Sequence, residues 1–271
     1  MIRSVGIIGF GFVGGAVSAF SAIKQVNIYD INRREYNSPE DRKAAYSSDV
    51  VFINVPTDLI NGRLDTSIVM SCVQDYIDCR DRKDNTVVIK STIPVGLCNI
   101  IKNKFDLNNI VFNPEFLTQR TALADFISQK EVYLSGAPEH TSHIKRLYKE
   151  FFNYHQNFDV IFFETKNHEQ VELLKLARNS YYALKVSFCN NIYNLCQKND
   201  IDYESFRNCF SNGEWVINQH TYVPGPDGKL GFGGKCLPKD VTELLNFASQ
   251  SGVEFKMLEE TIKFNEKQRT R

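Results

Sequence analysis

A glycine pattern near the N-terminus constrains the fold more than any other feature. The apolar run Ser4–Ile8 has the character of a buried strand, and residues 16–23 can continue as a helix. A strand, a turn with glycines at this spacing and a helix form the binding unit for the pyrophosphate of a dinucleotide. We therefore predict a Rossmann-like domain that contacts its cofactor through the turn residues, which are Gly9, Phe10, Gly11, Phe12, Val13 and Gly14.

The second strand ends at an acidic residue that indicates which dinucleotide binds. Residues 26–29 form this apolar strand, and Asp30 follows them, 21 residues after Gly9. A carboxylate at this distance accepts hydrogen bonds from the ribose hydroxyls of NAD, and it repels the 2′-phosphate of NADP. We therefore expect NAD as the cofactor. The guanidinium groups of Arg33 and Arg34 are close enough in sequence to keep NADP as the alternative.

Strand-like and helix-like segments then alternate, which is typical of a doubly wound parallel sheet. The expected strands cover residues 50–55, 86–90, 109–112, 131–135 and 160–163, and the expected helices cover 41–46, 65–77, 94–101 and 141–152. Polar residues follow three of these strands, in Pro56-Thr57, Ser91-Thr92 and Asn113-Pro114-Glu115. Because ligands bind at the carboxyl edge of such a sheet, Thr57 and Thr92 are candidate cofactor contacts, with helix capping as the simpler explanation.

The pattern changes after residue 164, where helical spacing takes over. Residues 169–198 contain no glycine or proline, so one spine helix of about 45 Å is expected. We place an α/β nucleotide-binding domain at residues 1–164 and an all-helical central domain at 165–271. The length of the spine helix and the apolar residues on more than one of its sides predict a homodimer. Lys175 and Asn179 share one face of it, although a surface lysine is the simpler interpretation of Lys175.

A second glycine-rich segment precedes an apolar-periodic helix and reads Gly231-Phe232-Gly233-Gly234-Lys235-Cys236-Leu237-Pro238-Lys239-Asp240. Proline is a good first residue for a helix, so Cys236 is expected just before a helix N-terminus. The helix dipole, its unpaired N–H groups and the neighbouring lysines favour a thiolate there. The alternative is a glycine turn with an incidental cysteine before a helix cap.

The composition limits the classes of function. The 32 Lys and Arg residues balance the 32 Asp and Glu residues, so nucleic acid is not expected as a partner. The sequence has no apolar run of about 18 residues, the length of a membrane span, so no membrane partner is expected. The seven cysteines lack CxxC spacing and the five histidines lack metal-ligand spacing. We therefore expect a reduced, cytoplasmic protein without a metal site.

Together these motifs resemble those of the nucleotide-sugar dehydrogenases, which oxidise UDP-glucose or GDP-mannose to the uronate for polysaccharide biosynthesis. The matching pieces occur in the family's order and cover nearly the whole chain. They are the turn from Gly9 to Gly14, Val55-Pro56-Thr57, Ser91-Thr92-Ile93-Pro94-Val95-Gly96, Asn113-Pro114-Glu115-Phe116-Leu117, Lys175 with Asn179, and the segment from Gly233 to Asp240. The Asn113 and Cys236 motifs together are the most specific of these.

The resemblance implies a chemistry and a role for each motif residue. A hydride passes from the sugar C6 alcohol to NAD, Cys236 captures the aldehyde as a thiohemiacetal, a second hydride transfer leaves a thioester, and water releases the acid. Lys175 and Asn179 would stabilise the alkoxide and the oxyanion, and Asp240 would hold or deprotonate the water. The implied substrate contacts are Glu115, Phe116, Leu117, Thr118, Lys175, Asn179, Tyr222, Phe232 and Gly233. The implied cofactor contacts beyond the turn and Asp30 are Thr57, Thr92, Gln119 and Lys239.

Three departures from the family pattern leave other functions open. Gln119 stands where the family has a glutamate, and an amide cannot act as a base. The segment between Asp30 and Val50 is much shorter than the corresponding segment of the family. The chain also ends where the family's third domain, which closes over the nucleotide, would begin. One alternative is a non-catalytic subunit that binds NAD and a sugar nucleotide. The other is a β-hydroxyacid-dehydrogenase-like enzyme with a single hydride step, which needs no cysteine.

Overall fold

The computed structural model describes residues 2–81, 84–213 and 216–270. They form two compact units. The N-terminal unit comprises Met1–Asp58 and Asp65–Lys175, and the C-terminal unit comprises Leu59–Leu64 and Leu176–Arg271. The division passes through the long helix α7 (His168–Lys198), so the two units share this helix. The predicted domain boundary between residues 164 and 165 stays a prediction.

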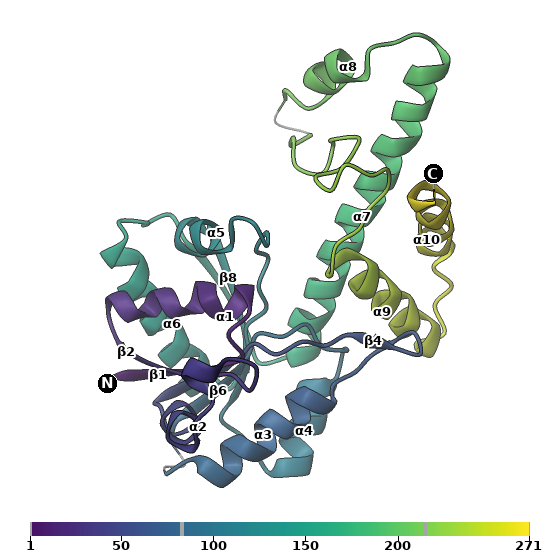
Figure 1. Cartoon of the computed structure of the whole chain (residues 1–271). Coiled ribbons are helices and arrows are strands. Elements are labelled where there is room, and N and C mark those ends of the chain that lie inside the picture. Colours follow the sequence, from purple (N-terminus) through teal and green to yellow (C-terminus); the bar gives the residue numbers. More distant parts are fainter. Residues whose placement is uncertain (1, 82–83, 214–215, 271) are drawn as a thin grey trace. The chain divides into compact units, whose positions relative to one another are not determined.

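A seven-stranded sheet is the centre of the N-terminal unit (Figure 1). Its strands follow one another in the order β2 (Gln25–Tyr29), β1 (Ser4–Ile8), β3 (Val50–Ile53), β6 (Thr86–Ile89), β7 (Ile110–Phe112), β8 (Glu131–Gly136) and β9 (Ile161–Thr165). Neighbouring strands are parallel, except that β7 and β8 are antiparallel. The predicted Rossmann-like sheet is confirmed, and the strands lie within two residues of their expected bounds.

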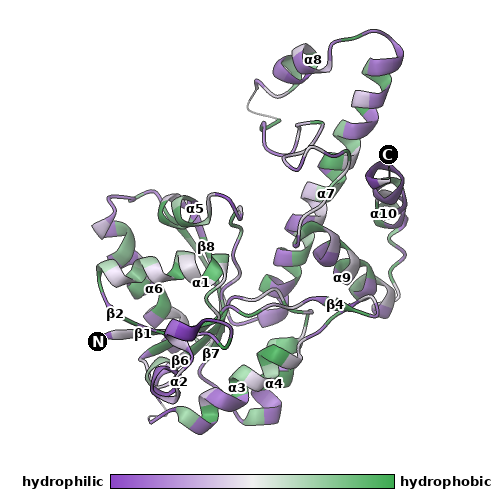
Figure 2. Ribbon diagram, viewed as in Figure 1, coloured by the Kyte–Doolittle hydropathy of each residue, from purple (hydrophilic) through white to green (hydrophobic). Residues whose placement is uncertain are grey.

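Helices cover both faces of this sheet, because its inner strands bury side chains on both sides. Alternate strand residues such as Val51 and Ile53 join the hydrophobic cluster formed with α2 (Pro39–Tyr46), α3 (Ser67–Cys79) and α4 (Leu97–Phe105). Their neighbours Val50 and Phe52 join the cluster formed with α1 (Phe12–Val17), the 3-10 helix η1 (Ser18–Ala22), α5 (Ala122–Ser128) and α6 (Pro138–Tyr154). Strands buried on both faces are continuous apolar runs, which Figure 2 shows in the hydrophobic colour.

The C-terminal unit is mostly helical. It contains the larger part of α7, together with α8 (Tyr203–Phe210), α9 (Leu237–Gln250) and α10 (Lys256–Arg269). A small hairpin of β4 (Leu59–Ile60) and β5 (Arg63–Leu64) also belongs to it. The Leu64 N–H donates to Glu243 Oε2 at 3.1 Å, and Asn246 Nδ2 donates to the Gly62 carbonyl at 2.6 Å. The hairpin is therefore attached to α9 by side chains from that helix.

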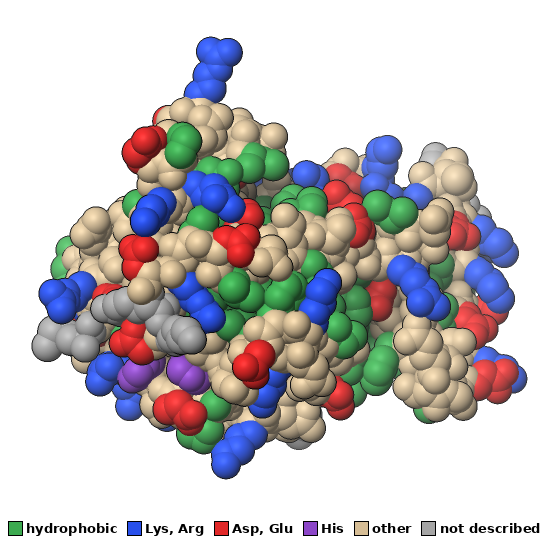
Figure 3. All heavy atoms as spheres, turned by 90° about the horizontal axis from the view of Figure 1, so that it is seen from below, with side chains coloured by type: hydrophobic (Ala, Val, Ile, Leu, Met, Phe, Trp, Pro, Cys, Tyr) green, Lys and Arg blue, Asp and Glu red, His purple; other side chains and the backbone are tan. Residues whose placement is uncertain are grey.

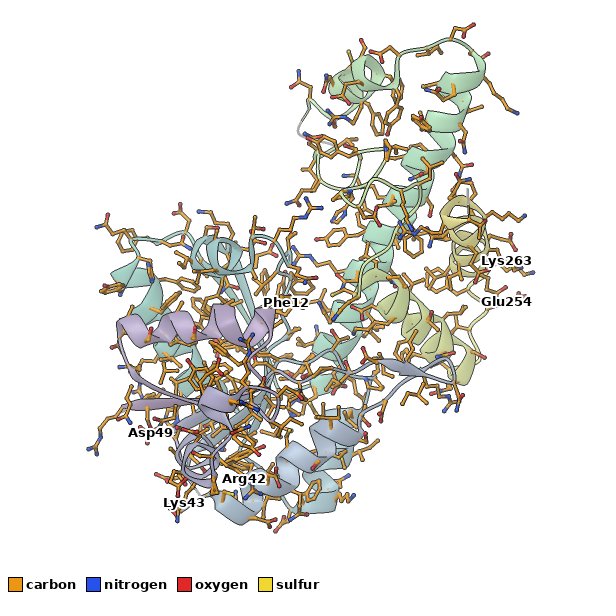
Figure 4. All side chains as sticks on the ribbon, in the orientation of Figure 1. Phe12, Arg42, Lys43, Asp49, Glu254 and Lys263 are labelled. Atoms are coloured by element: carbon orange, nitrogen blue, oxygen red, sulfur yellow. The ribbon has the colours of Figure 1, made fainter. Side chains whose placement is uncertain are left out.

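Two local predictions needed correction, and one element was not predicted. The helix expected from Pro94 begins at Leu97, because Gly96 takes a φ of +94° that no helix accommodates. The helix expected over residues 16–23 begins earlier, at Phe12 (labelled in Figure 4), and tightens into η1 after Val17. The hairpin was not predicted, because strands of two residues are too short to show alternation.

The surface of the described chain is mixed in charge. On the face drawn in Figure 3, acidic and basic side chains are interspersed. The helices of the described residues include none that is long and apolar enough to cross a bilayer.

Candidate active site

The turn after β1 has the geometry of a nucleotide cradle. Gly9 has a φ of +85°, and a Cβ there would lie 2.8 Å from the Asn54 carbonyl oxygen. A Cβ on Gly14 would lie 2.1 Å from the Gly9 carbonyl oxygen. A Cβ on Gly11, by contrast, would meet nothing within 4 Å. The outer glycines are therefore required by packing within the protein, whereas Gly11 borders open space that a pyrophosphate can fill.

Asp30 lies at the end of β2, beside this turn. Its Oδ2 accepts the Phe10 N–H at 2.6 Å, and its Oδ1 accepts the Asn32 N–H at 2.8 Å. Each carboxylate oxygen has two acceptor positions, so both can also receive a ribose hydroxyl. The Arg33 guanidinium donates to the Phe10 carbonyl at 3.4 Å and lies 5.6 Å from the Phe10 ring centroid. These residues fit NAD, and the Arg33 side chain is engaged by Phe10.

The loops after β3 and β6 meet at the carboxyl edge of the sheet. The Thr57 hydroxyl donates to the Thr92 carbonyl at 2.7 Å, and the Ser91 hydroxyl donates to the Val55 carbonyl at 2.7 Å. Both threonines are buried. The two candidate cofactor residues, Thr57 and Thr92, are therefore in direct contact. The Thr57 hydroxyl does not cap a helix; it connects the loop after β3 to the loop after β6.

The start of α4 is held by a carboxylate that the sequence analysis did not identify. Glu172 accepts the N–H groups of Gly96 at 2.6 Å and of Cys98 at 2.9 Å. The side chain is fully buried, and burial raises its pKa. The N-terminal partial charge of α4 compensates its negative charge. Glu172 lies on α7 one turn before Lys175. The same face of α7 therefore contacts the start of α4 through Glu172 and the turn at Glu115 through Lys175.

Lys175 is buried and paired. Its Nζ donates to the Glu115 carbonyl at 2.7 Å and lies 3.2 Å from Glu115 Oε1. It also lies 5.0 Å from the centroid of the Phe116 ring. Glu115 Oε2 accepts the Leu117 N–H at 2.6 Å, which closes the turn. With a side chain only 2% exposed, Lys175 is not the surface lysine of the simpler interpretation.

In the C-terminal unit, α9 brings the cysteine motif together with α7. Cys236 is the N-cap residue of α9, and the Asp240 N–H donates to its carbonyl at 3.0 Å. The Asp240 carboxylate is completely buried. It accepts Asn179 Nδ2 at 2.5 Å and Lys239 Nζ at 2.8 Å. The prediction that a helix begins just after Cys236 is confirmed, and Asn179 contacts the first turn of that helix.

Two buried asparagines hold the glycine-rich segment, and the sequence analysis did not identify either role. Asn190 on α7 accepts the Gly231 N–H at 2.9 Å. Asn265 on α10 accepts the Phe232 N–H at 2.6 Å and donates to its carbonyl at 3.0 Å. A Cβ on Gly231 would lie 2.4 Å from Asn265 Oδ1, so glycine is required there. In the sequence, nothing adjacent to Asn190 or Asn265 indicates that their side chains bind the backbone of the glycine-rich segment.

Of the remaining predicted site residues, Thr118, Gln119 and Tyr222 are exposed. Thr118 and Gln119 lie in an exposed turn after Leu117, where the Thr118 N–H donates to Asp125 at 2.8 Å. Tyr222 is half exposed, and the Arg207 guanidinium lies 4.0 Å from its ring centroid. Gly233 is close-packed, since a Cβ there would lie 2.6 Å from a guanidinium nitrogen of Arg269.

The predicted residues therefore form two groups, one in each unit. The N-terminal group contains the glycine turn, Asp30, Thr57, Thr92, Glu115 to Gln119, and Lys175. The C-terminal group contains Asn179, Tyr222, Phe232, Gly233, Cys236, Lys239 and Asp240. No group of three or more His, Cys, Asp or Glu side chains among the described residues is placed to hold a metal ion.

A Rossmann-type sheet with a glycine cradle, joined through a long helix to a cysteine motif, defines the chain as a dinucleotide-binding protein of the dehydrogenase class. Comparison with known families agrees with this. Residues 30–152 match the NAD binding domain of the UDP-glucose/GDP-mannose dehydrogenase family, and residues 169–267 match its central domain. The two matches together cover well over half of the chain, which therefore belongs to this family. NAD is its cofactor.

Individual relatives support the same assignment. UDP-glucose 6-dehydrogenase TuaD of Bacillus subtilis is 30% identical over 235 residues, which are 83% of this chain and 48% of the relative. The chain thus spans about half the length of the curated relatives it matches. A UDP-glucose dehydrogenase from Pyrobaculum islandicum has the same fold, with a TM-score of 0.78, 23% identity, and 98% and 68% of the two chains covered. A Mycobacterium tuberculosis 3-hydroxyisobutyrate dehydrogenase also shares the fold, with a TM-score of 0.75, 17% identity, and 98% and 94% of the two chains covered.

Proposed function

We propose that this chain oxidises the C6 alcohol of a nucleotide sugar to the carboxylate in two hydride transfers, with UDP-glucose as the favoured substrate. The observation that carries the proposal is the arrangement around α9. Cys236 caps the helix, and Asp240, one turn later, is held by Asn179 from α7. A one-step dehydrogenase of the same fold needs no cysteine at this place, so the motif favours covalent capture of an aldehyde.

Cys236 is the proposed nucleophile. NAD, when bound, accepts the hydride in each oxidation. The Cys236 sulfur forms a bond to the aldehyde carbon, whose oxygen takes up a proton to give the thiohemiacetal. Loss of the second hydride from that carbon and of the hydroxyl proton gives the thioester. Water then attacks the thioester carbonyl, and the carbon–sulfur bond breaks to release the acid and the thiol.

The charged residues have distinct proposed roles. Lys175 stabilises the alkoxide from which the hydride departs, because its ammonium is buried and already fixed by Glu115. Asn179 donates to the oxyanion of the tetrahedral species. Asp240 accepts the proton of the attacking water, and the hydrogen bonds from Asn179 and Lys239 fix the position of its carboxylate. Gln119 is an amide and cannot accept a proton as a base, so thioester hydrolysis depends on Asp240.

A substrate screen tests the proposal. The purified chain is mixed with NAD and with UDP-glucose, UDP-N-acetylmannosamine or GDP-mannose, and the absorbance of NADH is followed. We expect the fastest NADH formation with UDP-glucose. NAD binding without NADH formation from any of the three sugars would instead support the non-catalytic subunit.

Cofactor choice depends on Asp30. Replacing Asp30 with alanine should weaken NAD binding about tenfold, because two hydrogen bonds to the ribose are lost. NADP binding should weaken less, since the repulsion of its phosphate is also removed. Titration of both cofactors by calorimetry measures the two dissociation constants. Asp41→Ala, which removes a carboxylate from the start of α2, is the matched control. NADP binding as tight as NAD binding in the unsubstituted protein would show that Arg33 or Arg34 dominates.

We also propose a homodimer formed through the C-terminal unit. A groove of about 1020 Å³ is lined by side chains of α7 and α10, by Phe210 of α8, and by Val216, Ile217, Gln219 and His220. Large apolar side chains are exposed in its lining, including Tyr181 (63% exposed), Phe188 (52%) and Met257 (62%). Contiguous exposed apolar surface of this kind is typical of an interface, and closed symmetry makes a second copy of the chain the natural partner.

Sedimentation velocity at micromolar concentration tests the dimer. The chain should sediment as twice 31.1 kDa. Phe188→Glu should shift it to monomer, because a carboxylate would be buried in the interface. Ile68→Glu, at an exposed apolar residue of α3, should leave the dimer intact. A monomer in the unsubstituted protein would refute the proposal.

A further inference from the structure

Lys90 is a buried lysine to which the proposed chemistry assigns no role. It follows β6 directly and is 3% exposed. Its Nζ donates to the Asn113 carbonyl at 3.2 Å, to Asn113 Oδ1 at 3.0 Å and to Tyr148 Oη at 3.3 Å. These three acceptors match the three N–H donors of an ammonium group. Burying an ammonium group is costly unless it is hydrogen-bonded. Asn113 and Tyr148 together provide an acceptor for each N–H group of Lys90.

Asn113 is fixed by these and other bonds. Tyr148 Oη donates to Asn113 Oδ1 at 2.7 Å, which closes a triangle with Lys90. Asn113 Nδ2 donates to the Tyr133 carbonyl at 2.9 Å, and the Asn113 N–H donates to the Ile89 carbonyl at 2.9 Å. The side chain and the backbone of Asn113 therefore have a single orientation.

Asn113 is also the first residue of the turn that receives Lys175. Pro114 follows it and restricts the backbone, because its ring fixes φ. Glu115 comes next and accepts Lys175 with both its carbonyl and its carboxylate. A rigid path of two peptide units thus connects the Lys90 triangle to the Lys175–Glu115 pair.

We propose that Lys90 is a positioning residue, which holds the Asn113-Pro114-Glu115 turn in the conformation in which Glu115 receives Lys175. The proposal rests on the proposed function, in which Lys175 stabilises the alkoxide.

The charges around Lys90 support a role that depends on its ammonium. The groups that face it are Glu115, Lys175 and Tyr148. Burial and the charge of Lys175 lower the pKa of Lys90 to about 7, while the Glu115 carboxylate opposes this shift. Burial raises the pKa of Tyr148, so this side chain stays a neutral donor to Asn113. Glu115 and the three acceptors therefore favour the ammonium against burial and Lys175, and near pH 7 the ammonium and the neutral amine are both populated.

Kinetics provide the first test. In Lys90→Met, kcat should fall about 10- to 100-fold, because the turn that orients Lys175 is no longer fixed. KM and the NAD dissociation constant should change less than about threefold, since the cofactor cradle is untouched. Tyr148→Phe keeps the bonds between Lys90 and Asn113, so its kcat should fall about two- to fivefold. Lys149→Met, at the exposed neighbour of Tyr148 on α6, should behave as the unsubstituted protein. An unchanged kcat in Lys90→Met would overturn the proposal.

Amine labelling tests the same proposal without turnover. Lys175 should react slowly with a water-soluble acetylating reagent in the unsubstituted protein, and at least about tenfold faster in Lys90→Met, as measured by peptide mass spectrometry. Val5→Ala shortens a buried side chain in β1 and controls for general destabilisation; it should leave Lys175 protected. Equal labelling of Lys175 in Lys90→Met and Val5→Ala would refute the positioning role. Faster labelling in Lys90→Met alone, in a protein that oxidises no nucleotide sugar, would support the role and reject the proposed function.

Discussion

Replacing Cys236 with serine should stop turnover while NAD still binds. The serine hydroxyl is a poorer nucleophile but can capture some aldehyde, and an alkoxide leaves far less readily than a thiolate. The covalent ester should therefore accumulate, and kcat should fall by about 10³-fold or more. Intact-protein mass spectrometry after incubation with NAD and UDP-glucose detects the ester. Full turnover in Cys236→Ser would contradict the covalent mechanism.

The reactivity of Cys236 is tested by alkylation with iodoacetamide. Burial raises the pKa values of the Cys72, Cys98 and Cys189 thiols, in the case of Cys72 to about 11, so these should react slowly. Cys209 is exposed, which the sequence analysis did not anticipate, so labelling is best done in a Cys209→Ser background. Cys236 should then label fastest, as its place before a helix N-terminus predicts. Labelling no faster than the buried cysteines would argue against it as the nucleophile.

Replacing Lys175 with methionine should lower kcat/KM by about 10²- to 10³-fold, because the buried ammonium that we propose to stabilise the alkoxide is lost. The protein should also lose stability, since Glu115 would remain as a buried and uncompensated carboxylate. Steady-state kinetics and thermal denaturation separate the two effects.

A double variant distinguishes catalysis from stability at this pair. Lys175→Met combined with Glu115→Gln removes both charges, and should recover most of the lost stability without recovering activity. Lys198→Met, at the exposed end of α7, is the control for a lysine on the same helix. A kcat/KM within about threefold of the unsubstituted protein in Lys175→Met would mean that Lys175 is only structural.

The sequence predicts the sheet well because its signals are local. The inner strands β1, β3, β6 and β7 are largely apolar runs of three to five residues, and the glycine turn is determined by contacts within the first fifty-four residues. The hairpin of Leu59–Leu64 has no such signal, because its attachment depends on Glu243 and Asn246, far along the chain. Long-range side-chain contacts of this kind cannot be read from spacing.

The candidate site shows the same difference between local sequence signals, which could be recognised, and long-range contacts, which could not. Motif order identified Lys175, Asn179, Cys236 and Asp240 as residues of interest. Spacing alone favoured a surface position for Lys175, whereas its partner Glu115, sixty residues earlier, makes it a buried cation. The supporting residues Glu172, Asn190 and Asn265 lie within helices and act on distant loops, so nothing adjacent in sequence indicated them.

The number of NADH molecules formed for each molecule of sugar oxidised tests the central proposal most directly. A limiting amount of UDP-glucose is consumed completely in excess NAD, and NADH absorbance is compared with the uronate measured by chromatography. We expect two NADH for each uronate, with no free aldehyde, because in the proposed mechanism Cys236 retains the intermediate between the two oxidations. One NADH for each sugar, with a released aldehyde as the product, would contradict the two-step mechanism and favour a single-hydride dehydrogenase.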